Sequence, residues 1–244
     1  MKVYNKTMNT PLPTLYINLD SRKDRRVHVE AQLAALKSGI PNMEVERFNA
    51  IKHAVHGAIG CSMSHLRCIQ IAKERNWDQV FVCEDDIQFT NVPLFLAQLS
   101  EFMSTVPGWD VVLLAGNNIP PFQVMNDACI QVSNCQTTTG YIVRAHYYDT
   151  LMENYRAGIN QLMRHPAQKL DYAIDRYWFE LQRRDRWFLI TPLSVVQRED
   201  YSDIEQRMTN YGHLMLDLDK QQLIRRRMEQ QSRGVHMQMK PLKK

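Results

Sequence analysis

Three consecutive acids, Glu84, Asp85 and Asp86, directly follow the uncharged run Val80–Cys83. Side chains alternate along an extended segment, which puts Glu84 and Asp86 on one side and Asp85 on the other. Carboxylate oxygens suit Mg²⁺ or Mn²⁺, and such an ion bridging a diphosphate neutralises charge on a leaving phosphate. The acids therefore predict either a cation site for a nucleotide-diphosphate substrate, held by Glu84 and Asp86, or a solvated cap of the next turn.

The segments that must position these acids alternate between strand and helix patterns. We expect strands over residues 14–18, 44–48 and 79–83 and from residue 109, with helices between them. Ser21 and Asp24 fit a capping box at the start of the first helix, which should stop at Gly39. Strands that are apolar on both faces and alternate with amphipathic helices predict an α/β fold with a largely parallel sheet. Its binding crevice should lie beyond the carboxyl ends of the strands, where the acids fall.

The second half of the chain has a less regular pattern. We expect short strands over residues 129–133 and 141–143, a helix over 145–155 and another over "LDYAIDRYWFELQRR". Within that last helix, Tyr177, Trp178 and Leu181 have the spacing of a core face, or they form an aromatic platform for a sugar. No repeat or flexible linker interrupts the chain, so we predict one domain over residues 1–217 and a tail over 218–244.

Composition narrows the protein class. At 244 residues and 44% hydrophobic content, with no uninterrupted apolar run of about 18 residues and no secretory signal, the chain should be cytoplasmic. Five cysteines, an odd number without a C-x-x-C pair, predict reduced thiols, with neither a disulfide framework nor a zinc site. Residues 220–244 carry eight Lys/Arg and one Glu, so the tail either contacts the anionic inner face of a membrane or is a solvated terminus. We expect no nucleic acid partner.

Six segments together resemble the blocks of glycosyltransferase family 25, in order and spacing. They are "LYINLDSRKDRR", "GAIGCSMSHLRCIQIA", "VFVCEDDI", "TTTGYIVRAHYYDTLM", "KLDYAIDRYW" and "ITPLSVVQREDYSDIE". The blocks cover most of residues 14–205, whereas the segments between them match poorly. That family includes bacterial lipopolysaccharide and lipooligosaccharide galactosyltransferases and procollagen hydroxylysine galactosyltransferases.

The resemblance implies a GT-A-type, Rossmann-like fold and a UDP-sugar donor, UDP-galactose first and UDP-glucose second. It implies inverting transfer of the hexose to a hydroxyl of a glycan, a lipooligosaccharide or a hydroxylysine. Glu84 and Asp86 would correspond to the family's acidic motif and bind Mn²⁺ or Mg²⁺, with Asp85 on the donor ribose or sugar. The other donor-binding positions that the resemblance implies are Asn18, Arg22, Arg25, Ser64 and His65. The arginines also fit a solvated helix face, and His65 also fits a structural role in its turn.

An inverting transferase needs a base that deprotonates the acceptor hydroxyl. Asp171 matches the family's "P-V-D" position and is our choice over Asp175, although Lys169 and Leu170 replace Pro-Val and Asp171 also fits a helix cap. One more metal or diphosphate contact is expected near the end of the domain. Candidates for it are Gln197, the Ser202–Asp203 pair and His213.

Two other protein classes remain open. A sugar nucleotidyltransferase or metal-dependent phosphohydrolase also places acids at strand ends, but it predicts a glycine-rich phosphate loop after the first strand. The corresponding segment "LDSRKDRR" has no glycine before Gly39. A non-catalytic protein that binds through its basic tail is the second alternative, and it predicts that the acids are dispensable.

Overall fold

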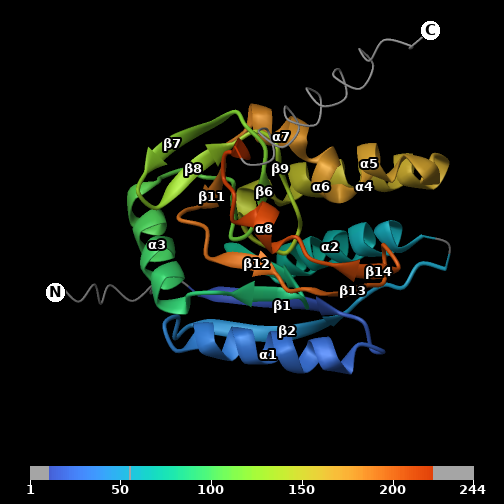
Figure 1. Ribbon diagram of the computed structural model, residues 1–244, viewed down its shortest axis with the longest axis horizontal. Coiled ribbons are helices and arrows are strands. Elements are labelled where there is room, and N and C mark those ends of the chain that lie inside the picture. The colour runs from blue at the N-terminus through green and yellow to red at the C-terminus, as the bar shows by residue number, and fades with distance from the viewer. Residues whose placement is uncertain (1–10, 55, 222–244) are drawn as a thin grey trace, which may run out of the picture.

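The computed structural model describes residues 11–54 and 56–221, in which an eight-stranded sheet is flanked by helices (Figure 1). Its strand order is β2-β1-β3-β10-β5-β11-β8-β7. Strands β10 and β8 run antiparallel to their neighbours and the others share one direction, so the predicted largely parallel sheet is confirmed. The strands of this sheet are β1 Leu12–Asn18, β2 Met43–Asn49, β3 Gln79–Glu84, β5 Val111–Leu113, β7 Phe122–Asn126, β8 Cys129–Val132, β10 Gly140–Arg144 and β11 Trp187–Ile190.

Smaller elements cover the ends of the sheet. Three two-stranded ribbons pair β4 with β12, β6 with β9 and β13 with β14. Their strands are β4 Ile87–Phe89, β6 Asn117–Asn118, β9 Cys135–Gln136, β12 Val195–Gln197, β13 Asp200–Ser202 and β14 Arg207–Thr209. The helices are α1 Lys23–Lys37, α2 Gly57–Glu74, α3 Val92–Thr105, α4 Tyr148–Arg164, α5 Lys169–Tyr172, α6 Ile174–Tyr177, α7 Phe179–Arg184 and α8 Gly212–Met215, with 3₁₀ turns at Ala145–Tyr147 and Pro166–Gln168.

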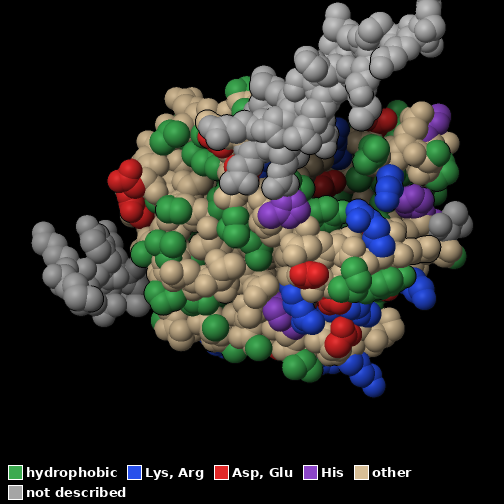
Figure 2. Space-filling view, in the orientation of Figure 1, with side chains coloured by type: hydrophobic (Ala, Val, Ile, Leu, Met, Phe, Trp, Pro, Cys, Tyr) green, Lys and Arg blue, Asp and Glu red, His purple; other side chains and the backbone are tan. Residues whose placement is uncertain are grey.

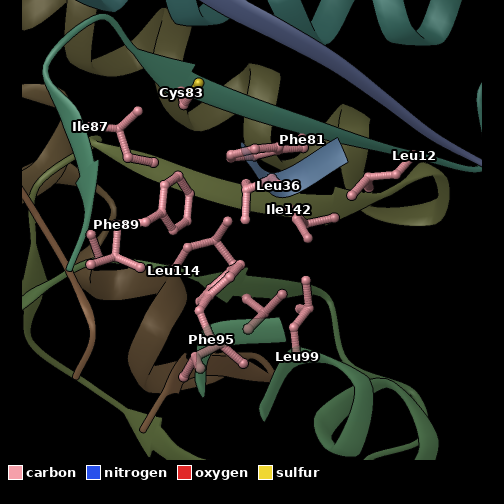
Figure 3. Close-up of a cluster of buried hydrophobic side chains, with 14 of the residues drawn as sticks. Leu12, Leu36, Phe81, Cys83, Ile87, Phe89, Phe95, Leu99, Leu114 and Ile142 are labelled. Carbon is pink, nitrogen blue, oxygen red and sulfur yellow. The ribbon is translucent and has the colours of Figure 1, made fainter. Parts of the chain in front are cut away.

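Both faces of the sheet are buried, because strand residues alternate between two hydrophobic clusters. On β3, Phe81 and Cys83 belong to the cluster under α1 and α3, whereas Val80 and Val82 belong to the cluster under α2 and α4. Figure 3 shows the first cluster, in which Phe95 of α3 reaches toward the strands. This alternation puts Glu84, the last residue of β3, on the side of α2.

The predicted boundaries of helices and strands agree best with the structure in the first half of the chain. The helix expected to end before Gly39 ends at Lys37, but Arg22 occupies its N-cap and no side chain caps it, so the capping box at Ser21 is wrong. The helix predicted over "LDYAIDRYWFELQRR" is broken into α5, α6 and α7, because Ala173 has an extended backbone with ψ of 145°. Trp178 and Leu181 are buried in the core, as their spacing predicted.

The described residues include only the start of the predicted tail, residues 218–221. Within the described residues, no helix has both the length and the apolar character needed to cross a bilayer. Most of the predicted basic tail, residues 222–244, lies outside the described residues. The tail and its predicted membrane contact therefore stay expectations.

Candidate active site

The acidic run lies at the carboxyl end of β3, in the turn that leads to β4, as expected. Two adjoining cavities open at this edge of the sheet, with volumes of about 480 Å³ and about 320 Å³. We call them the larger and the smaller cavity. Both are lined by Cys61, Glu84 and Gln197, and Ser202 and Ile204 of the β13–β14 segment also line both. Glu84 therefore stands where the two cavities meet.

The larger cavity gathers most of the residues that the sequence singled out. Asn18 and Asp171 do not line it. The predicted residues that do line it are Arg22, Arg25, Ser64, His65, Glu84, Asp85 and Asp86, together with the extra candidates Gln197, Ser202 and Asp203. Segments as distant as residues 21–25, 50–65 and 197–206 thus meet around the acidic turn.

The Glu84 carboxylate faces α2, on the side that the alternation of β3 dictates. Its Oε1 lies 3.2 Å from Nε2 of His65 and 3.7 Å from Sγ of Cys61, and it accepts a hydrogen bond from Thr138. Burial opposes ionisation, but the contacts with His65 and Thr138 hold the pKa of Glu84 below its usual value. Glu84 is therefore a preorganised, charged carboxylate at the junction of the cavities.

Asp85 and Asp86 both turn toward α1, where Nη1 of Arg25 donates to Asp85 Oδ1 at 2.9 Å and to Asp86 Oδ2 at 3.2 Å. The prediction that Glu84 and Asp86 point to one side rested on strict alternation. That premise is wrong, because the extended strand ends at Glu84 and residues 85 and 86 form a turn. All three acids nevertheless line the larger cavity.

The surroundings of Asp86 leave part of its negative charge without a compensating partner. Its side chain is 2% exposed, and Oδ2 accepts from Nε2 of Gln197 at 2.8 Å, whereas the buried Oδ1 has no hydrogen-bond partner. Burial and the nearby charge of Glu84 raise the pKa of Asp86 to about 7. A buried carboxylate oxygen without a partner is costly, so the site fits a group that would supply positive charge there.

Arg22 is already paired with acids from two elements. Its guanidinium contacts Asp24 at 3.0 Å, Asp200 at 3.2 Å and Asp203 at 2.7 Å. Arg25 also reaches Asp200, at 3.2 Å. Figure 2 shows basic and acidic side chains interspersed on the side of the molecule that carries β13 and β14. The alternative of a freely solvated basic helix face is therefore wrong for both arginines.

Two of the predicted donor-binding residues, Asn18 and Ser64, form hydrogen bonds to other parts of the protein. The buried Asn18 donates from Nδ2 to Asp85 at 2.7 Å and to the Arg22 carbonyl at 3.0 Å. Ser64 donates to the Gly60 carbonyl at 2.7 Å and accepts from the Ile51 amide at 2.8 Å. These contacts orient Asp85 and fix the loop that lines the larger cavity.

The glycine of "GAIGCSMSH" has a steric reason. A Cβ on Gly60 would lie 2.3 Å from the Ile51 carbonyl oxygen, so only glycine lets the loop cross α2 this closely. His65, four residues after Cys61 on α2, is fully buried and stacks on Tyr141, with Nδ1 3.1 Å from its hydroxyl. The block thus serves to hold His65 against Glu84.

The smaller cavity contains two carboxylates besides Glu84, namely Asp175 and Glu205. Glu205 is already engaged, because it pairs with Arg207 at 2.6 Å and accepts a hydrogen bond from the Tyr211 hydroxyl at 2.5 Å. Asp175 accepts from the Thr137 amide at 3.1 Å and has a pKa raised by burial. Asp171 is exposed on α5 and lines neither cavity. The preference for Asp171 over Asp175 does not fit this geometry, because only Asp175 reaches the space beside Glu84.

Three contributors were missed or left open by sequence reasoning. Cys61 was treated only as an apolar thiol, although it precedes His65 by four residues and so shares its helix face. Thr138 and Asp200 lie in two of the six blocks, but neither was singled out, and they reach the site from a loop and a short ribbon. Of the suggested extra contacts, Gln197 touches Asp86 and Asp203 touches Arg22, whereas His213 lines neither cavity.

Sequence comparison decides the family. The sequence model of glycosyltransferase family 25 (LPS biosynthesis protein) matches residues 52–163, which include Cys61, His65 and the three acids. Residues 52–163 belong to glycosyltransferase family 25. The protein is a glycosyltransferase, as the six blocks suggested. No curated protein matches the chain in sequence.

Solved structures of glycosyltransferases align with this chain. A glycosyltransferase involved in glycosylation of the major capsid of PBCV-1 aligns with a TM-score of 0.50 and 11% identity, over 85% of this chain and 90% of that one. A mutant of Drosophila β1,4-galactosyltransferase 7, in complex with manganese, UDP-Gal and xylobiose, aligns with a TM-score of 0.45 and 9% identity, over 86% and 81%. The first of these likenesses shows a shared fold, and the predicted GT-A-type α/β class is confirmed.

Proposed function

We propose that this glycosyltransferase moves a hexose from a UDP-sugar, UDP-galactose first and UDP-glucose second, to an acceptor hydroxyl with inversion. The observation that carries the proposal is the junction of two cavities at Glu84 and Gln197. A transfer reaction needs two substrates whose reacting atoms meet. Two adjoining spaces that share a wall of polar side chains meet that requirement.

The larger cavity suits the donor. Arg22 and Arg25 line it together with the N-terminal residue of α2, Gly57, and both guanidinium groups and helix N-termini favour phosphate oxygens. The diphosphate would take the place of Asp200 and Asp203 on these arginines, since their donors are already engaged.

Glu84 and Asp86 would hold Mn²⁺ or Mg²⁺ in this cavity, as the resemblance implies. The fit rests on their oxygen ligands and on Asp86 Oδ1, which is buried without a partner. When bound, the cation would supply positive charge that stabilises the departing diphosphate. Gln197 already orients Asp86 through the hydrogen bond to Oδ2.

The smaller cavity suits the acceptor, and Asp175 is the carboxylate placed to act as the base. It would take the proton of the acceptor hydroxyl as that oxygen forms a bond to the anomeric carbon. The bond from that carbon to the UDP oxygen breaks, and UDP leaves with the electron pair. Leu170, Ile174 and Tyr211 add apolar and aromatic surface of the kind that contacts sugar rings.

The test is a panel of UDP-sugars incubated with the full chain and Mn²⁺, with and without glycan, lipooligosaccharide and hydroxylysine peptide acceptors. Acceptor-dependent UDP release with an inverted anomeric linkage by NMR is expected. Release of UMP and sugar phosphate would instead identify the nucleotidyltransferase or phosphohydrolase alternative.

The variant Asp86→Asn should lower turnover of the donor by at least ~10²-fold, because it removes charge from the proposed cation site. The exposed Asp127→Asn, in the β7–β8 turn, is the matched control and should retain the rate of the unmodified protein. Normal turnover by Asp86→Asn would contradict the proposed site. No turnover by the unmodified protein, with a binding function that needs residues 220–244 and not Asp86, would favour the non-catalytic alternative.

A further inference from the structure

Cys61, His65 and Glu84 converge at the junction of the two cavities. Their ligand atoms, one sulfur, one nitrogen and one oxygen, all lie within 4.8 Å of one another. All three residues line the larger cavity. The oxygen-only site proposed above uses Glu84 as well, but it does not involve Cys61 or His65.

We propose that these three side chains form a second, thiolate-containing metal site that takes Zn²⁺ in preference to Mn²⁺ or Mg²⁺. The site deepens the proposed function, since a zinc ion there would occupy Glu84 and inhibit transfer. The sequence prediction of no zinc site rested on the absence of a C-x-x-C pair. In this set, two ligands lie four residues apart on a helix, and the third lies at the end of a strand.

The two distances from Glu84 are close to those of tetrahedral coordination. With Zn–N and Zn–O bonds of about 2.0–2.1 Å and Zn–S of about 2.3 Å, ligand atoms in a tetrahedron lie about 3.3–3.6 Å apart. Glu84 Oε1 lies 3.2 Å from His65 Nε2 and 3.7 Å from Cys61 Sγ. Glu84 therefore lies at about the right distance from both other ligands, and Cys61 Sγ and His65 Nε2 lie within 4.8 Å of each other.

Helix geometry explains why the set is held in place. Cys61 and His65 are four residues apart on α2, which puts both side chains on one face. Tyr141 contacts Nδ1 of His65 at 3.1 Å, and Tyr155 in turn donates to the Tyr141 hydroxyl at 3.2 Å. Such a partner for the other ring nitrogen fixes the orientation of metal-binding histidines.

Ligand chemistry selects the metal. A thiolate, a neutral imidazole and a carboxylate carry two negative charges, which balance one divalent ion, and the thiol proton leaves to water on binding. Sulfur and imidazole ligands suit Zn²⁺, whereas Mn²⁺ and Mg²⁺ prefer oxygen. The cavity leaves the fourth position open to water or to a substrate oxygen.

The experiment titrates the full chain with Co²⁺ as a spectroscopic probe, followed by Zn²⁺. A thiolate-to-cobalt absorption band should appear and then disappear as zinc displaces cobalt. Cys61→Ser should abolish the band and weaken zinc binding at least ~10-fold, because loss of a direct ligand should cost no less than loss of an outer-shell partner. Cys68→Ala, a buried cysteine on the same helix, is the control and should keep the band.

A second measurement uses the unmodified protein, so it does not depend on how the variant folds. Cys61 is the one cysteine of the five that is not fully buried, so a thiol reagent should reach it first. Burial and the charge of Glu84 raise the pKa of this thiol, so labelling should be slow and is best followed at alkaline pH. Zinc, but not Mg²⁺, should slow that labelling at least ~10-fold, as mapped by mass spectrometry. Cobalt binding without a thiolate band, or unchanged labelling with zinc, would overturn the site.

These readouts separate the two proposals. If the thiolate band appears in a protein that releases no UDP, the metal site is supported and the proposed transfer from a UDP-sugar is contradicted. UDP release that saturating zinc leaves unchanged would remove the inhibitory role. Loss of activity with zinc, reversed by a chelator and weakened in Cys61→Ser, is the expected result.

Discussion

The two cavities share Glu84 but are built in different ways. Regular elements frame the larger one, which α1, α2 and β3 line with ion-paired arginines and carboxylates. Short elements frame the smaller one, which α5, α6 and the β6–β9 ribbon line with a mixture of apolar and polar side chains. The paired arginines of the larger cavity suit a diphosphate. The smaller cavity also carries the charged Lys169 and Arg176, but its apolar and aromatic side chains suit a sugar acceptor. Substitutions in the two cavities should therefore separate donor from acceptor effects.

Substitution of Asp175 in the smaller cavity should have the largest effect on activity and therefore tests this division most directly. Asp175→Asn should lower kcat at least ~10²-fold, because it removes the proposed base, while the donor KM stays within about twofold. Asp171→Asn, one turn earlier and exposed, is the matched control and should retain activity. Initial rates at saturating donor provide the measurement, and the reverse ranking of the two variants would restore Asp171 as the base.

A stability measurement tests the larger cavity without substrate. The pKa of Asp86 is raised to about 7 in the folded protein, from about 3.8 when unfolded. The folded state therefore binds the proton more tightly, and the stability from this group is complete below pH 3.8 and lost as the pH rises through 7. Asp86→Asn should raise the free energy of unfolding of the metal-free protein by about 1–3 kcal/mol at pH 8.

Urea denaturation with a chelator present, at pH 5 and pH 8, provides the readout. The gain should be larger at pH 8 than at pH 5, and Asp127→Asn should show no such difference. A loss of stability at both values would mean that the ion pair with Arg25 outweighs the repulsion from Glu84. A variant that is more stable and less active would show that Asp86 is retained for function.

The same contrast between cavities explains what the sequence revealed. The apolar runs of β1 and β3 and the helix after "GAIG" have strong local periodicity, so the sheet edge and its acids were predictable. The turn at Asp85 and Asp86 breaks strand alternation, and no local pattern shows that both face Arg25. Asp200 and Thr138 reach the site only through tertiary packing of short ribbons and loops. Asp175 was passed over because Asp171 matched the family's "P-V-D" position, and no local pattern showed that Ala173 breaks the helix between the two acids.

A smaller effect tests the acceptor side. Leu170 is 72% exposed at the rim of the smaller cavity. Leu170→Ala should raise the acceptor KM about 3–10-fold, since burying part of this side chain under an acceptor is worth about 1 kcal/mol. The donor KM should stay unchanged, as should both constants in Leu94→Ala, an exposed site on α3. A change confined to the donor KM would contradict the division between the cavities.

The smallest effect, and the most specific for the donor side, belongs to Asp203. Its carboxylate contacts Arg22 at 2.7 Å and is 47% exposed, so the pair should contribute about 0.2–1 kcal/mol. If the diphosphate replaces Asp203 on Arg22, Asp203→Asn should lower the donor KM about 2–5-fold at low ionic strength, and added salt should reduce the gain. Asp149→Asn, which breaks an exposed pair with Lys73, should leave the donor KM unchanged. A raised donor KM in Asp203→Asn would contradict this expectation. It would indicate that the carboxylate contacts the cation or the donor, which is the role for which Asp203 was one of the sequence candidates.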